Sequence, residues 1–384
     1  MKNIKSLILI FIITLSLTKL IDIIVGHFLL KEEQKIELNK VRVLDRNILL
    51  KEHFPNQNVF VSVPERYFLN KNYENKKYKF RTDNNGFILG PKDNSESEKI
   101  DFIFFGGSTT ECIFVDEDLR FPYLLSEKLE HKNGERLNIL NAGVSGNHSL
   151  HSLINFLAKG IEKKPKFAVL MHAANDMGTL LLTHSYWDDH PSKKIIQTEG
   201  EPSLKIHFNG IIFELSRIIK NTLIPNFWLY SRDYLFNTIR SEDLNKDDYT
   251  NFRENKITYN EIKNLLDQDF SSSLVSFVKL SRSWNIEPIL MTQFNNYPDK
   301  KLISPGSIIS PEQLYNIYKH TNEIVRKIAL DNDVLLIDLD KKISDQSFFY
   351  DYIHLNSSGS VAVANEIART LERKFPNLYK FKKD

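Results

Sequence analysis

The sequence predicts an α/β fold with a parallel five-stranded sheet and helices on both of its faces, together with an N-terminal membrane helix and a helical insertion. Three observations predict this fold class. Five short apolar runs alternate with helix-length amphipathic segments after residue 100, an apolar stretch with a basic start opens the chain, and a long segment at about 180–260 interrupts the alternation. Alternation of strands and helices is typical of a parallel sheet covered by helices.

The composition describes a soluble globular body with a nearly neutral charge. Of the 384 residues, 41% are hydrophobic and 26% are charged, and the formal net charge is +2. A nucleic-acid partner normally requires a basic stripe or patch, and no block of five or six like charges occurs, so we expect no nucleic-acid partner. The single cysteine, Cys112, excludes an intramolecular disulfide and a cysteine-based zinc site, and we interpret it as a buried structural thiol.

Residues 1–30 have the pattern of an export signal that is kept as a membrane anchor. Lys2 and Lys5 precede an apolar run, which continues after Lys19 and Asp22. A basic start followed by an apolar stretch marks a signal segment. No clear small-x-small cleavage site follows, which favours a retained anchor over a removed signal peptide. We therefore expect membrane attachment through this helix, with the main domain outside the cytoplasm in the cell envelope or periplasm. The alternative is an amphipathic helix of the soluble domain.

Residues 31–99 form a predicted extension that precedes the main domain. A polar helical stalk gives way to an extended stretch by about residue 60. Further on, Asn84, Asn85 and Gly86 lie between alternating apolar positions, which predicts a hairpin because Asn and Gly tolerate positive φ. A polar linker then leads to the main domain, and a basic tail at 376–384 ends the chain.

The main domain, 100–375, carries the alternating pattern. Its runs are mostly apolar on both parities, as expected for strands that are buried on both faces. The predicted strands are 102–105, 137–140, 167–171, 286–292 and 334–339. The predicted helices are about 121–131, 149–162, 261–284, 311–331 and 358–374. Ser310 as N-cap and Pro311 at the first helical position support the fourth helix.

The insertion at 180–260 breaks this rhythm between the third and fourth predicted strands. It contains an apolar piece, 211–230, between polar segments rich in Asn, Asp and Lys. We interpret it as a cover over one end of the sheet, either a lid near a substrate or a structural cap.

Residues that can carry chemistry follow the predicted strands at the point where each strand ends. In an open parallel sheet, ligands bind beyond the carboxyl ends of the strands. Ser108 follows Gly106 and Gly107 after the first strand, so its hydroxyl could lie above the sheet at a tight strand-to-helix turn. The same three residues also fit an ordinary helix N-cap. The hydrolase elbow G-x-S-x-G is absent, because Thr110 stands where its last glycine would be.

Hydrogen-bond donors follow the second and third strands. Gly143 and Gly146 lie at the start of a helix, where backbone N–H groups can hold an anion, although a plain tight turn explains them as well. Asn175 stands at the end of the third strand, where its side-chain amide could donate to the same pocket or form a turn. His172 ends that strand and could line the pocket.

After the fifth strand, Asp351 and His354 form an Asp-x-x-His motif. A serine hydroxyl is a poor nucleophile until a base takes its proton, and the base needs a carboxylate to fix its tautomer. Two residues on one short turn can supply both groups without long-range organisation. The sequence thus predicts that Ser108, His354 and Asp351 act together.

Taken together, the four segments resemble the four sequence blocks of the SGNH (GDSL-like) hydrolase family in residue type, order and placement. The resemblance covers the main domain and implies a flavodoxin-like, three-layer α/β/α fold that acts on ester bonds. It implies that Ser108 is the nucleophile, and that the N–H groups of Ser108 and Gly146 and the amide of Asn175 form the oxyanion hole. By the same resemblance, Asp351 and His354 are the acid and base of the last block.

Two positions depart from the pattern of the family. Gly107 stands where the family has Asp, and Ala173 replaces the glycine two residues before the block asparagine. Neither change removes a catalytic atom, although both leave the subfamily open. Gly107, Thr109 and His172 are expected to lie next to the catalytic residues, where they either support those residues or contact the substrate.

The resemblance predicts a serine esterase that removes acetyl or other acyl groups from a carbohydrate or a lipid through an acyl-enzyme, with no cofactor and no metal. Two alternatives remain. The same serine could transfer an acyl group onto a cell-surface polysaccharide, because exclusion of water separates transfer from hydrolysis and the sequence does not report it. The domain could also be a non-catalytic carbohydrate-binding or scaffold module that keeps the fold.

Overall fold

The computed structural model describes residues 13, 16–17, 20, 45–63, 76–92, 99–187, 195–199, 257–296 and 309–382. The chain divides into two compact units, Met1–Asn47 with Thr198–Leu204, and Ile48–Gln197 with Lys205–Asp384. The central sheet belongs to the second unit. Within the described residues, no helix combines the length and the apolar character needed to cross a membrane. The predicted anchor at 1–30, apart from four single positions, and the apolar piece of the predicted insertion lie outside these residues.

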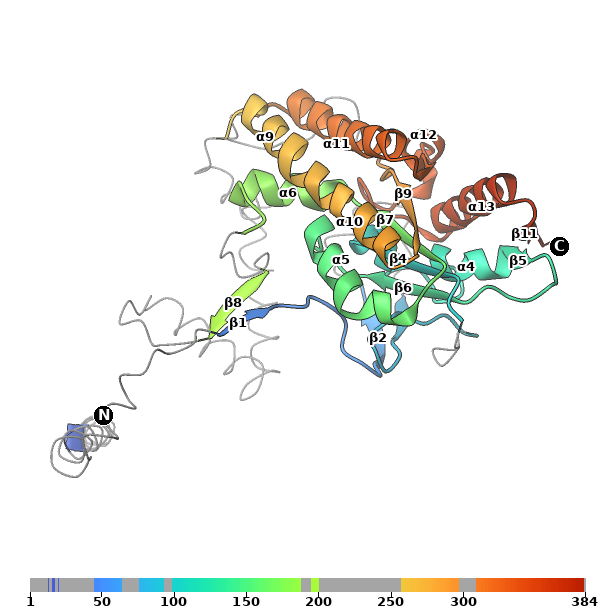
Figure 1. The fold of residues 1–384 in the computed structure, drawn as a ribbon, viewed down its shortest axis with the longest axis horizontal. Coiled ribbons are helices and arrows are strands. Elements are labelled where there is room, and N and C mark those ends of the chain that lie inside the picture. The colour runs from blue at the N-terminus through green and yellow to red at the C-terminus, as the bar shows by residue number, and fades with distance from the viewer. Residues whose placement is uncertain are drawn as a thin grey trace. The chain divides into compact units, whose positions relative to one another are not determined.

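Five parallel strands form the central sheet (Figure 1). In spatial order they are β10 (Leu335–Ile337), β9 (Glu287–Met291), β7 (Phe167–Met171), β4 (Phe102–Gly106) and β6 (Ile139–Gly143). Each neighbouring pair is parallel. Counted along the chain, this is the order 2-1-3-4-5 of flavodoxin-like sheets. The parallel five-stranded sheet predicted from the sequence is confirmed.

Two hydrophobic cores lie on opposite faces of the sheet. Successive residues of a strand point to opposite faces. Accordingly, Ile103 and Phe105 of β4 enter one core, and Phe102 and Phe104 enter the other. All four side chains are almost fully buried, which explains why this run is apolar on both parities.

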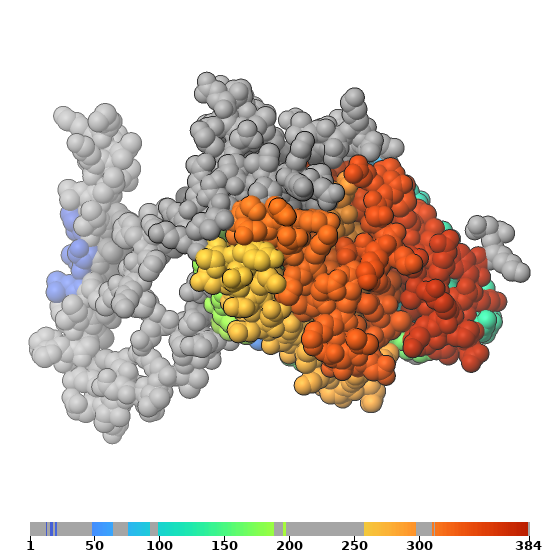
Figure 2. Space-filling view, turned by 90° about the horizontal axis from the view of Figure 1, so that it is seen from above, coloured from blue at the N-terminus to red at the C-terminus, as the bar shows by residue number. Residues whose placement is uncertain are grey.

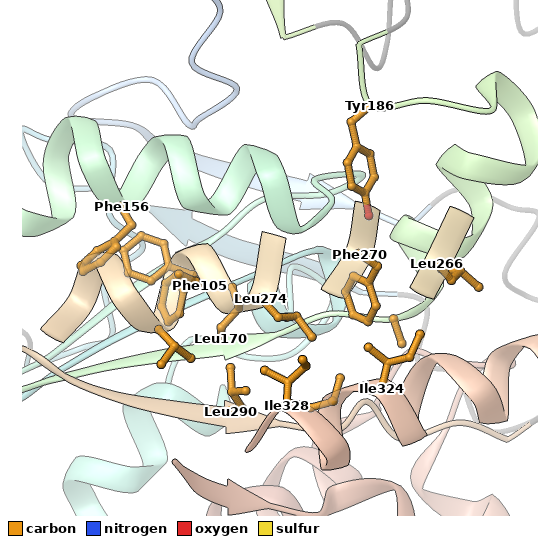
Figure 3. Close-up of a cluster of buried hydrophobic side chains, with 14 of the residues drawn as sticks. Phe105, Phe156, Leu170, Tyr186, Leu266, Phe270, Leu274, Leu290, Ile324 and Ile328 are labelled. Carbon is orange, nitrogen blue, oxygen red and sulfur yellow. The ribbon is translucent and has the colours of Figure 1, made fainter. Parts of the chain in front are cut away.

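Helices cover both cores and complete the three layers. The helices over the first core include α5 (Ser149–Asn155), α10 (Ser271–Ser283) and α11 (Pro311–Asp331), and those over the second are α4 (Phe121–Lys128) and α13 (Ser357–Lys374). Figure 3 shows Phe105, Leu170 and Leu290 of the sheet beside Leu274 of α10 and Ile328 of α11. The outer sides of α11 (orange) and α13 (red) form part of the surface in Figure 2.

The remaining described elements are short. The helices are α3 (Ser108–Glu111), η3 (Phe156–Gly160), η4 (Ile161–Lys163), α6 (Ala174–Thr183), α9 (Tyr259–Leu265), η7 (Leu266–Phe270), α12 (Leu339–Lys342) and η8 (Gln346–Phe348). The other strands pair in twos: β1 (Asp45–Ile48) with β8 (Ile196–Glu199), β2 (Asn58–Ser62) with β3 (Lys77–Arg81), and β5 (Leu129–His131) with β11 (Tyr379–Phe381).

Several predicted elements, including two helices and a strand, have different bounds in the structure. The helix predicted at 121–131 ends at Lys128, because the next three residues pair with β11 as an antiparallel strand. The helix predicted at 261–284 consists of α9, the π-helical turn η7 and α10. The strand predicted at 137–140 begins two residues later and continues to Gly143.

The hairpin predicted around Gly86 is only partly present. Gly86 turns the chain with φ +75°, as the sequence predicts. However, β3, which precedes the turn, pairs along its length with β2, and a single bridge joins Thr82 and Ile88 across the turn. The N–H of Ile88 donates to the carbonyl of Asn141 in β6 at 2.8 Å. The segment after the turn therefore docks on the edge of the main sheet, a long-range pairing that the local turn signal does not encode.

Candidate active site

The ends of three adjacent strands of the sheet lie level. In the register, Gly106 at the end of β4 aligns with Gly143 of β6 and with Met171 of β7. The chain order of the strands switches between β4 and β7, and ligands of open α/β sheets bind beyond the carboxyl ends of the strands at such a point. Ser108 follows β4, and Asn175 follows β7. Both residues therefore lie beyond the carboxyl ends of adjacent strands.

Ser108, His354 and Asp351 form a continuous chain of contacting polar groups. The Nε2 of His354 lies 2.8 Å from the Oγ of Ser108, and its Nδ1 lies 2.6 Å from Oδ2 of Asp351. Ser108 begins α3, whereas the other two residues come from the turn before α13. The side chains of His354 and Asp351 are 16% and 22% exposed, so solvent reaches the group in the described part of the structure.

A tight turn holds Asp351 against His354. Its Oδ1 accepts the N–H groups of Ile353 and His354 at 2.9 and 2.7 Å, while Oδ2 faces the imidazole. The ring of Tyr350 stacks on the imidazole, with centroids 5.5 Å apart and 6° between the planes. Burial raises the pKa of Asp351, but the hydrogen bond and charge of His354 and the two N–H groups outweigh it and leave the pKa below its ordinary value. The carboxylate is therefore ionised at neutral pH.

Ser108 is the first helical residue of α3 and not its N-cap. The N-cap is Gly107, which has extended φ and ψ and no side chain to accept a hydrogen bond. The helix-cap alternative raised by the sequence therefore does not apply, since the Ser108 hydroxyl faces His354. After one turn, α3 ends at Glu111, and the next residue, Cys112, has a buried thiol whose pKa is raised by burial to about 12. A thiol in this state is an inert structural group, as the sequence predicts.

Gly107 lies in close contact with the side chain of Asn175. The Nδ2 of Asn175 donates to the carbonyl of Asn147 at 2.8 Å. A Cβ on Gly107 would lie only 2.3 Å from this nitrogen, so any larger residue would displace the amide. Glycine at 107, one of the departures from the family pattern, therefore leaves the space that the Asn175 amide occupies in this chain.

The loop after β6 contains Gly146. Gly146 has φ +75°, a backbone conformation that favours glycine. The next residue, Asn147, is buried, and its carbonyl is the acceptor for the Asn175 amide. This hydrogen bond joins the loop after β6 to the start of α6. The residue that follows Gly146 thus contacts the Asn175 side chain directly.

His172 directly follows β7, and its contacts lie among the helices next to Asn175. Its Nε2 is 2.8 Å from Oγ of Ser152 in α5, and its Nδ1 is 3.5 Å from the carboxylate of Asp176. Burial lowers the pKa of His172 although the charge of Asp176 opposes this effect. Asp176 also accepts the N–H of Ser149 at 2.9 Å, which ties α6 to the start of α5. The structure places His172 as a support for these helices.

Gln293, which the sequence analysis does not single out, bridges two helices of the site. It follows β9 and is 4% exposed. Its Nε2 donates to Oγ1 of Thr109 at 3.0 Å, and its Oε1 accepts the N–H of Ala174 at 2.7 Å. One side-chain amide therefore joins the residue after Ser108 to the residue before Asn175. The sequence signal for Gln293 is a polar residue close after a predicted strand, a position that the other site residues share.

His148 and His151, three residues apart, pack as aromatic groups. Both are buried, and their ring centroids are 3.8 Å apart. His148 also stacks on Tyr186 at 4.5 Å with 13° between the planes. In the part of the chain that the structure describes, no three His, Cys, Asp or Glu side chains are grouped so that they could hold a metal ion.

Comparisons with known proteins find similar solved structures. No family model and no curated protein matches the chain. An acetyl xylan esterase, AlAXEase, is 16% identical with a TM-score of 0.41, and the match covers 71% of this chain and 100% of that one. An acetylxylan esterase from Geobacillus stearothermophilus is 13% identical with a TM-score of 0.38, covering 74% and 95%. A GDSL-like lipase from Bacteroides thetaiotaomicron VPI-5482 is 13% identical with a TM-score of 0.37, and the match covers 73% of this chain and 92% of that one.

Proposed function

We propose that the protein is a serine esterase in which Ser108 is the nucleophile, His354 the general base and Asp351 the carboxylate that orients it. The observation that carries this proposal is the chain from the Ser108 Oγ through the imidazole to the Asp351 carboxylate, with distances of 2.8 and 2.6 Å. Such a chain activates a hydroxyl, because the imidazole takes its proton while the carboxylate holds the ring and stabilises the imidazolium. The place of Ser108 at the switch point of the sheet supports the same assignment.

In the first half of the proposed reaction, the acyl group of the ester moves to the serine. The Oγ of Ser108 attacks the carbonyl carbon while its proton passes to Nε2 of His354, and the carbonyl oxygen becomes an oxyanion. The tetrahedral intermediate then breaks its bond to the alcohol oxygen, and His354 returns the proton to that oxygen. The products of this half are an acyl-serine and a free alcohol.

In the second half, water replaces the alcohol. His354 takes a proton from the water while the water oxygen attacks the carbonyl carbon of the acyl-serine. His354 then returns this proton to the Ser108 oxygen as the carboxylic acid leaves. Hydrolysis requires water at the base, and the His354 side chain is 16% exposed in the described part of the structure. Comparing hydrolysis with acyl transfer to an added sugar acceptor decides between the two reactions.

Three N–H groups are proposed to receive the oxyanion: those of Ser108 and Gly146 in the backbone and that of the Asn175 side chain. The Asn175 amide nitrogen carries two hydrogens, and the carbonyl of Asn147 accepts one of them at 2.8 Å. That bond orients the amide before substrate binds. The second hydrogen can then donate to the oxyanion without reorganisation, which is the condition for strong stabilisation of the transition state.

Replacing Asn175 by alanine is expected to lower kcat on p-nitrophenyl acetate by about 10²–10³-fold, the usual effect of losing one oxyanion donor. KM should change little, because the donor acts on charge that develops only in the transition state. Steady-state hydrolysis measures both constants. Asn175 is only partly buried, so a thermal scan should show an unfolding temperature close to that of the wild type. An unchanged kcat would remove Asn175 from the oxyanion hole.

The direct test of the proposed function is covalent capture of the nucleophile. A fluorophosphonate reacts with an activated serine hydroxyl, and mass spectrometry of the digested protein locates the adduct. We expect the full-length protein to form one adduct, on Ser108, and to hydrolyse p-nitrophenyl acetate. Labelling of another serine would contradict the assignment, and the absence of both labelling and turnover would leave the non-catalytic alternative.

The proposed substrate is an O-acylated carbohydrate or lipid of the cell envelope, reached from the membrane. The support for this location is the pair Lys2 and Lys5 followed by an apolar segment, the pattern of a retained signal anchor. Fractionation of cells should recover the full-length protein with the membranes, and protease added to spheroplasts should digest its main domain. Recovery in the soluble cytoplasmic fraction would contradict the proposed location.

A further inference from the structure

The residues before β2 run as an extended arm along the main domain. Residues 49–54 are called the N-terminal arm. Their exposure alternates, since positions 49, 51 and 53 are half-buried and positions 50, 52 and 54 are exposed. A period of two is that of an extended chain with one side against a surface. Lys51 and His53 are therefore arm residues that face the domain.

The Lys51 carbonyl holds the loop after β6. It accepts the side-chain amide of Asn147 at 3.1 Å and that of Asn155 at 3.0 Å. Both asparagines are buried. The carbonyl of Asn147 in turn accepts the amide of Asn175 at 2.8 Å. One backbone group of the arm thus binds the residue that orients Asn175 and that directly follows Gly146.

His53 joins the end of α3, the helix that begins at Ser108, to the end of β6. Its Nε2 lies 3.0 Å from Oε1 of Glu111, the last residue of α3, and 3.2 Å from the carbonyl of Gly143, the last residue of β6. Both partners are acceptors, so this nitrogen carries a hydrogen. Glu111 is 1% exposed, and a buried carboxylate needs donors, which His53 and the hydroxyl of Ser145 supply. The arm thereby completes a polar contact between two segments that carry proposed oxyanion donors.

We propose that the N-terminal arm is part of the catalytic apparatus, with His53 and the Lys51 carbonyl as positioning groups. They hold the loop after β6, residues 144–148, which we call the oxyanion loop, against α3, the helix that begins at Ser108. The inference rests on the proposed esterase function. An oxyanion hole depends on donors that are oriented before the reaction. Displacement of a catalytic group by about 1 Å can lower a rate by roughly 10²-fold. Loss of the arm contacts should therefore slow the chemical step even though the arm does not touch the reacting atoms.

The arm also makes a contact that attaches it to the main domain but does not involve the two positioning groups. Glu52, between the two positioning groups, forms an ion pair with Lys159 at 2.7 Å. This pair fastens the arm to η3 and involves neither the oxyanion loop nor Glu111. Removing it weakens the attachment of the arm but leaves the contacts of His53 in place. Glu52→Gln is therefore the matched control.

The test uses full-length variants assayed on p-nitrophenyl acetate. His53→Leu removes the ring donor, and Asn147→Ala removes the amide that binds the arm while keeping the carbonyl that orients Asn175. Each should lower kcat by about 10- to 100-fold, with a small change in KM and a parallel slowing of fluorophosphonate labelling. His53→Gln keeps an N–H donor and should recover most of the lost rate. Glu52→Gln should match the wild type.

Two outcomes would overturn the inference. One is a wild-type kcat in both His53→Leu and Asn147→Ala, and the other is an equal fall in Glu52→Gln, which would mean that any weakening of the arm has the same effect. If His53→Leu does not fold, Asn147→Ala decides the question. A wild-type protein that neither hydrolyses the ester nor labels at Ser108 would instead remove the proposed function, so the two failures are distinguishable.

Discussion

Ser108→Ala is expected to lower kcat for ester hydrolysis by about 10⁶-fold, because loss of the nucleophile alone costs a serine hydrolase about as much as loss of its whole triad. The substitution removes only the oxygen that lies 2.8 Å from Nε2 of His354. Any remaining rate would come from the oxyanion donors and from substrate binding. Hydrolysis of p-nitrophenyl acetate, measured against the rate in buffer, checks this expectation.

Two comparisons make the Ser108→Ala result specific. The double variant with His354→Ala should be no slower than Ser108→Ala, since residues that act as one unit are not additive. Ser281→Ala is the control, because it deletes another serine hydroxyl, a buried one that donates to the carbonyl of Phe277 in α10 at 2.8 Å. That control should keep its activity. Full activity in purified Ser108→Ala would end the assignment of the nucleophile.

Asp351→Asn is expected to lower kcat by about 10⁴-fold, the effect of the equivalent change in the serine protease triad. The carboxylate lies 2.6 Å from Nδ1 of His354 and holds the hydrogen of the ring on that nitrogen. An amide can turn its NH₂ group toward Nδ1, which places the ring hydrogen on Nε2. The imidazole can then no longer accept the proton of Ser108. Hydrolysis of p-nitrophenyl acetate measures the loss.

Asp345→Asn is the control for Asp351→Asn. Asp345 also shapes a local turn, where its carboxylate accepts the N–H of Ser347 at 2.9 Å, but it lies in an exposed position before η8. Its substitution should leave kcat unchanged. A similar loss in both variants would indicate that a disturbed turn, and not the wrong tautomer of His354, causes the effect.

Asp351→Asn should also change how the free energy of unfolding depends on pH. Burial raises the pKa of Asp351, but the hydrogen bond and charge of His354 outweigh it, so the pKa in the folded protein is lowered. The resulting stabilisation is fully present above the ordinary pKa of Asp, about 3.9, and is lost as the pH falls through the lower folded value. The difference in unfolding free energy between wild type and Asp351→Asn should therefore shrink in acid. Urea titrations at several pH values measure it, and a constant difference would contradict this account.

Local signals in the sequence were sufficient to predict several strands and helices. The run 167–171 is apolar at every position and forms β7 with these bounds, buried throughout. The helix 311–331 also has its predicted bounds, because Ser310 accepts the N–H of Gln313 and Pro311 begins the helix. Both signals act within a few residues. The predicted anchor at 1–30 lies almost wholly outside the described residues and stays a prediction.

Elements that depend on distant partners were predicted less well. The three residues of β5 continue an amphipathic pattern, so they read as the end of a helix, yet they pair with a strand about 250 residues later in the chain. In the same way, the turn at Gly86 is locally encoded, but the pairing of the segment that follows it with Asn141 is not. A local pattern records which conformations a segment can adopt, and tertiary pairing selects among them.

For the candidate site, the sequence by itself determined which residues can carry the chemistry. Asp351 and His354 meet inside one turn, so their spacing already encodes their contact. Ser108 lies 246 residues from His354, and only the level strand ends and the packing of α13 bring the two within 2.8 Å. Only the tertiary structure also shows the contacts of residues that the sequence left in a stalk or passed over, namely Lys51, His53 and Gln293. Their hydrogen bonds reach across the fold, and a polar residue carries no local signal of the partner that burial will bring to it.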